Sequence, residues 1–112
     1  ALLAGADRPT GILCMTDLVA RDVIGAAQEQ GLVVPDDLSV VGFDDGPIAS
    51  RTNPRLTTIA QDVDEKGRAA ARALREALRA RDEQDRGPAD RRLPVNLVVR
   101  QSTSAVPVAA SR

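Results

Sequence analysis

The chain has 112 residues, of which 43% are apolar and 28% are charged, as expected for one small domain or part of a larger one. Its net charge is −1, so it lacks the basic excess of a nucleic-acid-binding domain, and we do not expect it to contact DNA itself. It contains no His and one Cys, which excludes His-dependent nucleophiles, His-built zinc sites and an intrachain disulfide. No apolar stretch reaches transmembrane length.

The first half of the chain predicts a strand, a helix and a second strand. Residues 10–15 form a short apolar run that reads as a buried strand. Helical spacing of apolar residues follows over 17–30, with Thr16 or Asp17 as the N-cap. A second apolar run covers residues 38–43. This is the size of one right-handed βαβ unit, and because both strands are apolar throughout, we expect helices on both faces of a parallel sheet.

The second half predicts an extended segment, a long helix and a last strand. Residues 56–61 are extended and half polar, and Asp62 caps a helix over 63–81. The spacing predicts that this helix buries one side made of Val63, Gly67, Ala70, Leu74, Ala77 and Leu78. If the chain is a fragment of a longer protein, we expect that side to be exposed in this chain alone. Residues 93–100 predict a strand, and residues 102–112 predict a frayed tail.

Polar residues follow the predicted strands where an open α/β sheet binds its ligands. Thr16 and Asp17 follow the first strand, Asp44 and Asp45 follow the second, and Gln61 ends the extended segment. Asp44 is the main candidate, because it comes directly after the apolar run. Asp17 reads more simply as a helix cap, and Asp45 reads equally well as a turn residue before Gly-Pro.

Three chemistries fit a pair of carboxylates at this edge. Asp44 can accept hydrogen bonds from two neighbouring hydroxyls of a sugar-like ligand. Asp44 and Asp45 can hold Mg²⁺, although the sequence supplies no clear set of further ligands. A general acid and base is the weakest option, since adjacent residues of a strand point to opposite faces. Binding therefore ranks above a metal site, and a metal site above catalysis; we expect no enzyme, no metal and no cofactor.

Four stretches, in order and at the usual spacing, resemble the C-terminal part of the LacI/GalR transcriptional regulators. They read PTGILCMTDLVA, GLVVPDDLSVVGFDD, PRLTTIAQD and LPVNLVVRQST, and begin at Pro9, Gly31, Pro54 and Leu93. Together they cover nearly the whole chain.

The resemblance implies an α/β fold of the periplasmic-binding-protein-like type (type I), a parallel sheet flanked by helices, present here as a partial domain. Residues 1–59 would belong to the C-terminal lobe of the effector-binding domain. Residues 60–92 would cross over and build a helix of the N-terminal lobe, and residues 93–112 would return as a C-lobe strand and tail. A DNA-reading helix-turn-helix would lie upstream of Ala1.

The resemblance also implies roles for residues. Asp44 would hold effector hydroxyls, Gln61 would line the cleft near the hinge, and Thr16 stands where the family usually has an effector-binding Asn. With Asp17 these are the predicted effector-binding residues. The implied protein is a cytoplasmic homodimer in which a sugar-like or nucleoside-like effector, bound between the lobes, controls operator binding. The alternative is a periplasmic sugar-binding receptor of a transporter, which shares the fold.

Overall fold

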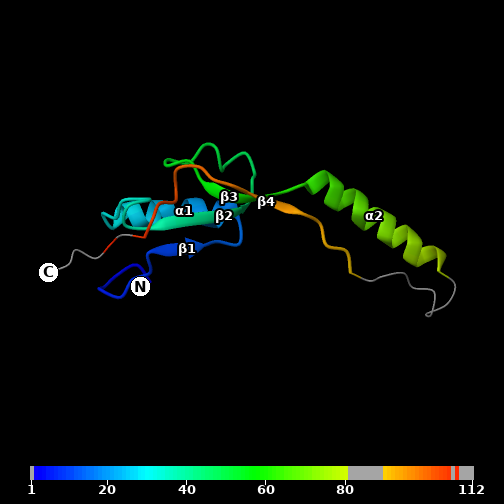
Figure 1. The fold of residues 1–112 in the computed structure, drawn as a ribbon, viewed down its shortest axis with the longest axis horizontal. Helices are drawn as coiled ribbons and strands as arrows, with labels where there is room; N and C mark the ends of the chain where they lie inside the picture. Colours follow the sequence, from blue (N-terminus) through cyan, green and yellow to red (C-terminus); the bar gives the residue numbers. More distant parts are fainter. Residues whose placement is uncertain (1, 81–89, 107, 109–112) are drawn as a thin grey trace. The chain divides into compact units, whose positions relative to one another are not determined.

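The computed structural model describes residues 2–80, 90–106 and 108. Six elements follow one another: β1 (Gly11–Leu13), α1 (Asp17–Glu29), β2 (Ser39–Asp44), β3 (Thr57–Gln61), α2 (Val63–Arg79) and β4 (Val95–Val98) (Figure 1). The chain divides into two compact units, one of residues 1–60 with 96–112 and one of residues 61–95. In the described part of the chain no helix is both long and apolar enough to cross a membrane.

The sheet has the strand order β1-β2-β3-β4, and both pairs β1–β2 and β2–β3 are parallel. Ile12 lies opposite Val40, and Phe43 lies opposite Ile59. The predicted α/β fold with a parallel sheet is confirmed. Because neighbouring parallel strands end at the same edge, the ends of β1 and β2 lie next to each other, where α1 begins.

Helix α1 begins and ends as its terminal residues predict. The Thr16 hydroxyl accepts a hydrogen bond from the backbone N–H of Val19 at 3.2 Å, so Thr16, and not Asp17, is the N-cap. The helix ends at Glu29, followed by Gln30 as the C-cap and by Gly31 with a φ of 78°. Glycine adopts this left-handed conformation at little cost, which stops the helix.

The core lies between α1 and the sheet. The buried side of the helix is made of Ala20, Ile24 and Ala27. These residues form one cluster with buried apolar residues of the strands and loops: Cys14, Val34, Leu38, Val40, Ala49 and Leu56. Small alanines on the helix let it approach the strands closely, and branched residues of the sheet fill the space between them.

The prediction that residues 10–15 are a buried strand is wrong in part. β1 has three residues, and beyond Ile12 the exposed fractions of Leu13 and Met15 are 69% and 88%. Successive side chains of a strand point to opposite faces, so Ile12 packs against the core while Leu13 lies on the opposite face of the sheet. Among the described residues of this unit only α1 forms a helix, so the expected helices on both faces are not present within it.

The prediction of a frayed tail from residue 102 is also wrong at its start. Ser102 is fully buried, and its backbone carbonyl accepts a hydrogen bond from the Val40 N–H at 2.8 Å. Its hydroxyl donates to the Val40 carbonyl at 2.6 Å and accepts from the Thr57 N–H at 2.8 Å. The segment after β4 therefore bridges β2 and β3 near their starts. Residues 107 and 109–112 of the predicted tail lie outside the described residues.

The second unit contains α2. The Asp62 carboxylate accepts a hydrogen bond from the Glu65 N–H at 2.9 Å, which confirms the predicted cap. Ala69 is the buried residue of the helix, while Val63, Leu74 and Leu78 are 63%, 62% and 78% exposed. These apolar residues of α2 are therefore exposed, as predicted for this chain alone. The described helix ends at Arg79, and Arg81, where the prediction ended, lies outside the described residues.

Candidate effector site at the carboxyl edge of the sheet

Asp44 is the last residue of β2, and its backbone adopts an unusual conformation. Its φ is 112°, and the φ of Asp45 is 56°. The value at Asp45 is typical of the left-handed region that Asp tolerates, whereas the value at Asp44 lies outside it. Such conformations cost about 1–3 kcal/mol each and persist only where surrounding contacts maintain them. Both residues are half-buried. The predicted main ligand residue therefore lies on strained backbone at the carboxyl edge of the sheet.

Asp17 is buried beneath this turn. One of its carboxylate oxygens, Oδ1, accepts a hydrogen bond from the Thr58 hydroxyl, and the other, Oδ2, accepts one from the Gly46 N–H at 2.8 Å. The side chain is 3% exposed. A buried carboxylate is tolerated when polar groups satisfy it, and here the first turn of α1 is joined to β3 and to the loop after β2.

Gly42 leaves the space that Asp17 occupies. A Cβ added at Gly42 would lie 2.8 Å from Leu56 Cδ2 and closer still to Asp17 Oδ1. Both neighbours are buried, so neither can move into solvent. The glycine of the VVGFDD stretch is therefore explained by the approach of α1 to β2.

Asp45 forms an ion pair with Arg100, from the segment after β4. Arg100 Nη2 lies 2.7 Å from Asp45 Oδ1, and both side chains are largely shielded from solvent, with 22% and 28% exposed. The same guanidinium donates through Nη1 to the Leu56 carbonyl at 2.9 Å. The sequence left Asp45 open between a ligand-binding residue and a turn residue, and neither interpretation foresaw this ion pair with Arg100.

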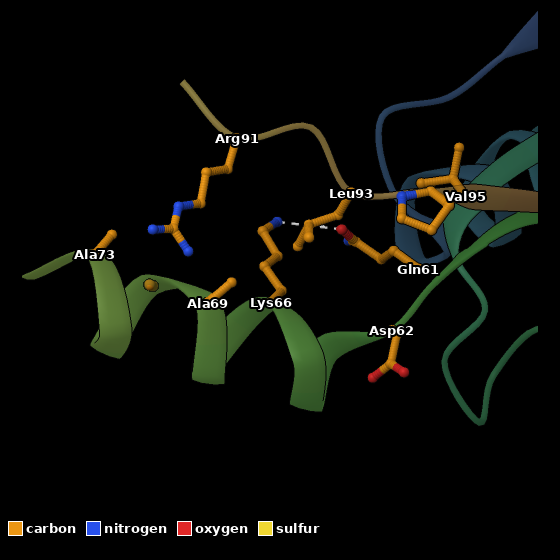
Figure 2. A pocket seen from close by; sticks show the side chains of 10 residues that line it. Gln61, Asp62, Lys66, Ala69, Ala73, Arg91, Leu93 and Val95 are labelled. Carbon is orange, nitrogen blue, oxygen red and sulfur yellow. Dashed lines mark hydrogen bonds between the residues drawn. The ribbon is translucent and has the colours of Figure 1, made fainter. Parts of the chain in front are cut away.

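The other two predicted residues lie in different units. Thr16 is half-buried in the first unit, at the start of α1. Gln61 belongs to the second unit, where its side-chain oxygen accepts a hydrogen bond from Lys66 Nζ at 3.1 Å. Figure 2 shows this contact at one end of a pocket of about 370 Å³ between α2 and the segment of residues 91–95. Ala69 and Ala73 line the α2 side of this pocket, so it is mainly apolar.

Cys14 lies close to the carboxyl edge but does not share its polarity. A second pocket, of about 410 Å³, is lined by Leu13, Cys14, Met15 and Phe43. Cys14 is 5% exposed, and burial raises the pKa of its thiol above the ordinary value. Cys14 is one of the buried residues of the core cluster. Among the described residues, no three His, Cys, Asp or Glu side chains gather as a metal site would require.

Three residues that join distant segments of this unit were not singled out from the sequence. Thr58, Arg100 and Ser102 all act through contacts with residues more than 40 positions away. Arg100 and Ser102 lie in the LVVRQST stretch, where charged and hydroxyl residues directly follow an apolar run, and that was the available signal.

Comparison with known proteins agrees with this architecture. The Periplasmic binding protein-like domain family matches residues 1–103. The HTH-type transcriptional repressor CytR of Escherichia coli K12 is 38% identical over 99 residues, which are 88% of this chain and 28% of CytR. The chain thus spans less than a third of that relative.

Two solved structures show the same fold. The Lac repressor dimer bound to operator and the anti-inducer ONPF has a TM-score of 0.71 and 37% identity, covering 87% of this chain and 32% of that one. The complex of the transcriptional regulator CelR with cellobiose has a TM-score of 0.72 and 28% identity, covering 83% of this chain and 28% of that one. The chain therefore belongs to the periplasmic binding protein-like domain family, and within it to the LacI/GalR transcriptional regulators.

Proposed function

We propose that this chain is part of the effector-sensing domain of a cytoplasmic, dimeric transcriptional regulator. Its effector is a sugar-like or nucleoside-like molecule, bound in a cleft between two lobes and coupled to operator binding by a change in lobe angle. The cleft, the coupling and the upstream helix-turn-helix follow from the resemblance to the LacI/GalR regulators. The names of the relatives support this: CytR is an HTH-type repressor, and the solved Lac repressor is a dimer bound to operator. They favour a regulator over an exported receptor.

The observation that carries the proposal is the Asp44 carboxylate at the end of β2. It lies at the edge where ligands of parallel α/β sheets bind, on backbone maintained against strain. A carboxylate there can accept two hydroxyl hydrogen bonds, each worth about 1.5–3 kcal/mol when charge-assisted. CelR, a structural relative, was solved with a carbohydrate of this kind, cellobiose.

The other predicted residues take different parts in the proposal. The Thr16 hydroxyl caps α1 by accepting from the Val19 N–H and can still donate one hydrogen bond to an effector. Gln61 is kept as an effector-binding residue on the resemblance alone. Both oxygens of Asp17 accept hydrogen bonds within the protein. We therefore assign Asp17 to the support of the site through Gly46, which follows the Asp44–Asp45 pair directly.

The test is the affinity of full-length Asp44→Asn for hexoses, cellobiose and nucleosides, measured by calorimetry. Loss of the charge should weaken the best ligand at least about 10-fold, since a charge-assisted bond is exchanged for a neutral one. Asp22→Asn is the matched control, because Asp22 is an exposed carboxylate that pairs with Arg21 on α1. Equal affinity of Asp44→Asn and the control would remove Asp44 from the site.

A further inference from the structure

Arg100 connects the segment after β4 to the carboxyl end of β2. Its backbone N–H donates to the Thr57 hydroxyl at 2.9 Å, and the next residue, Gln101, donates from its N–H to the Arg55 carbonyl at 2.9 Å. Its guanidinium then reaches the Leu56 carbonyl and the Asp45 carboxylate. Both the backbone and the guanidinium of Arg100 are thus held by hydrogen bonds, which fix the positive charge beside Asp45.

The turn that carries Asp44 is held from two sides. Asp17 accepts a hydrogen bond from the Gly46 N–H, and Arg100 pairs with Asp45. The two contacts are made by Asp45 and Gly46, the residues that directly follow Asp44. Asp44 itself has the strained φ of 112°. Strained backbone relaxes when its restraints are removed, so these two contacts help to hold the turn that carries Asp44.

We infer that Arg100 is a positioning residue of the effector site, which keeps the Asp44 carboxylate in its binding direction through the ion pair with Asp45. This inference rests on the proposed effector role of Asp44. Arg100 itself is not assigned a contact with the effector. Its effect on affinity runs through Asp45 and the backbone of the turn.

The geometry also explains why arginine serves at this position. Two different nitrogens of the planar guanidinium serve the Leu56 carbonyl and the Asp45 carboxylate at once. The ammonium of lysine is a compact point charge and cannot reproduce that fork. Arg100→Lys should therefore keep the charge and the fold but restore only part of the positioning.

The first experiment needs no ligand. Hydrogen exchange of the Gly46 amide is measured in the full-length protein and in its Arg100→Gln, Arg100→Lys and Asp45→Asn variants. Loss of the ion pair should speed exchange about 10-fold, because the turn then opens locally more often, with Arg100→Lys in between. Arg21→Gln, which removes an exposed ion pair on α1, is the matched control and should leave exchange unchanged. Rates equal to the control in both Arg100→Gln and Asp45→Asn would overturn the inference.

The second experiment measures ligand affinity. Cellobiose and cytidine are first tested on the full-length protein, and the one that binds more tightly is then used for the variants. Arg100→Gln and Asp45→Asn should each weaken binding about 5- to 10-fold, and the double variant should lose no more than either, since coupled residues are not additive. Positioning through Asp45 would be refuted if the loss of affinity in the double variant were the product of the two single losses. Unchanged affinity in both single variants would refute it as well. If neither probe binds, or Asp44→Asn binds normally, the proposed function fails, and the Gly46 exchange rate still decides whether Arg100 holds the turn.

Discussion

Removal of the Ser102 hydroxyl tests how the last segment is built into the sheet. Ser102 is fully buried, and its Oγ joins the Val40 carbonyl to the Thr57 N–H. In Ser102→Ala both backbone groups lose this partner inside the protein. A buried polar group left unpaired costs about 1–3 kcal/mol, so two of them should lower the free energy of unfolding by about 2–4 kcal/mol, after allowance for the hydroxyl that is no longer buried. Domains are commonly stable by only about 5–15 kcal/mol, so this is a large fraction.

The assay is urea unfolding of the full-length protein, followed by circular dichroism. The midpoint should fall while the dependence on urea stays the same, because the surface exposed on unfolding is unchanged. Ser104→Ala is the matched control: Ser104 is exposed, and its hydroxyl donates to the Pro35 carbonyl at 3.2 Å. Its loss should cost no more than about 0.5 kcal/mol. If Ser102→Ala and Ser104→Ala have the same midpoint, the Ser102 bridge does not stabilise the sheet.

Three further predictions concern other places in the chain. Gly42→Ala should destabilise the protein by about 1–3 kcal/mol in the same urea assay, because the new Cβ collides with buried neighbours. Gly25→Ala is the control: a Cβ at Gly25 meets open space, so this change should be neutral or stabilising. Equal effects of the two changes would contradict the packing described at Gly42. Asp62→Ala should lower the stability of α2 by about 0.5–2 kcal/mol through loss of its cap, measured as reduced thermal stability, and an unchanged melting curve would show that the cap contributes nothing. Because burial raises the pKa of the Cys14 thiol, Ellman's reagent should react more slowly with Cys14 in the folded protein than in urea, and stability should fall as pH rises above the thiol's ordinary pKa; equal rates would show that Cys14 is accessible.

Sequence alone determined the elements and their order, because local signals specify them. The apolar spacing over 17–30 and the cap at Asp62 predicted α1 and α2 to within a few residues, and the apolar run over 38–43 predicted β2 with a shift of one residue. The family and the fold followed from motifs that can be read directly along the chain. The position of Asp44 at the end of a parallel strand was likewise predictable, since it needed only the strand and the direction of its neighbours.

Only the tertiary structure decided which polar residues work together. Asp17 looked like a helix cap, yet Thr16 caps the helix and Asp17 is buried between Gly46 and Thr58. Ser102 looked like the start of a frayed tail, yet it is part of the sheet, and the Asp45–Arg100 pair joins residues 55 positions apart. Such contacts leave no periodic signal, because they depend on which segments the fold brings side by side. Exposure of Leu13 was decided in the same way, since a strand's pattern cannot say which layers cover its two faces.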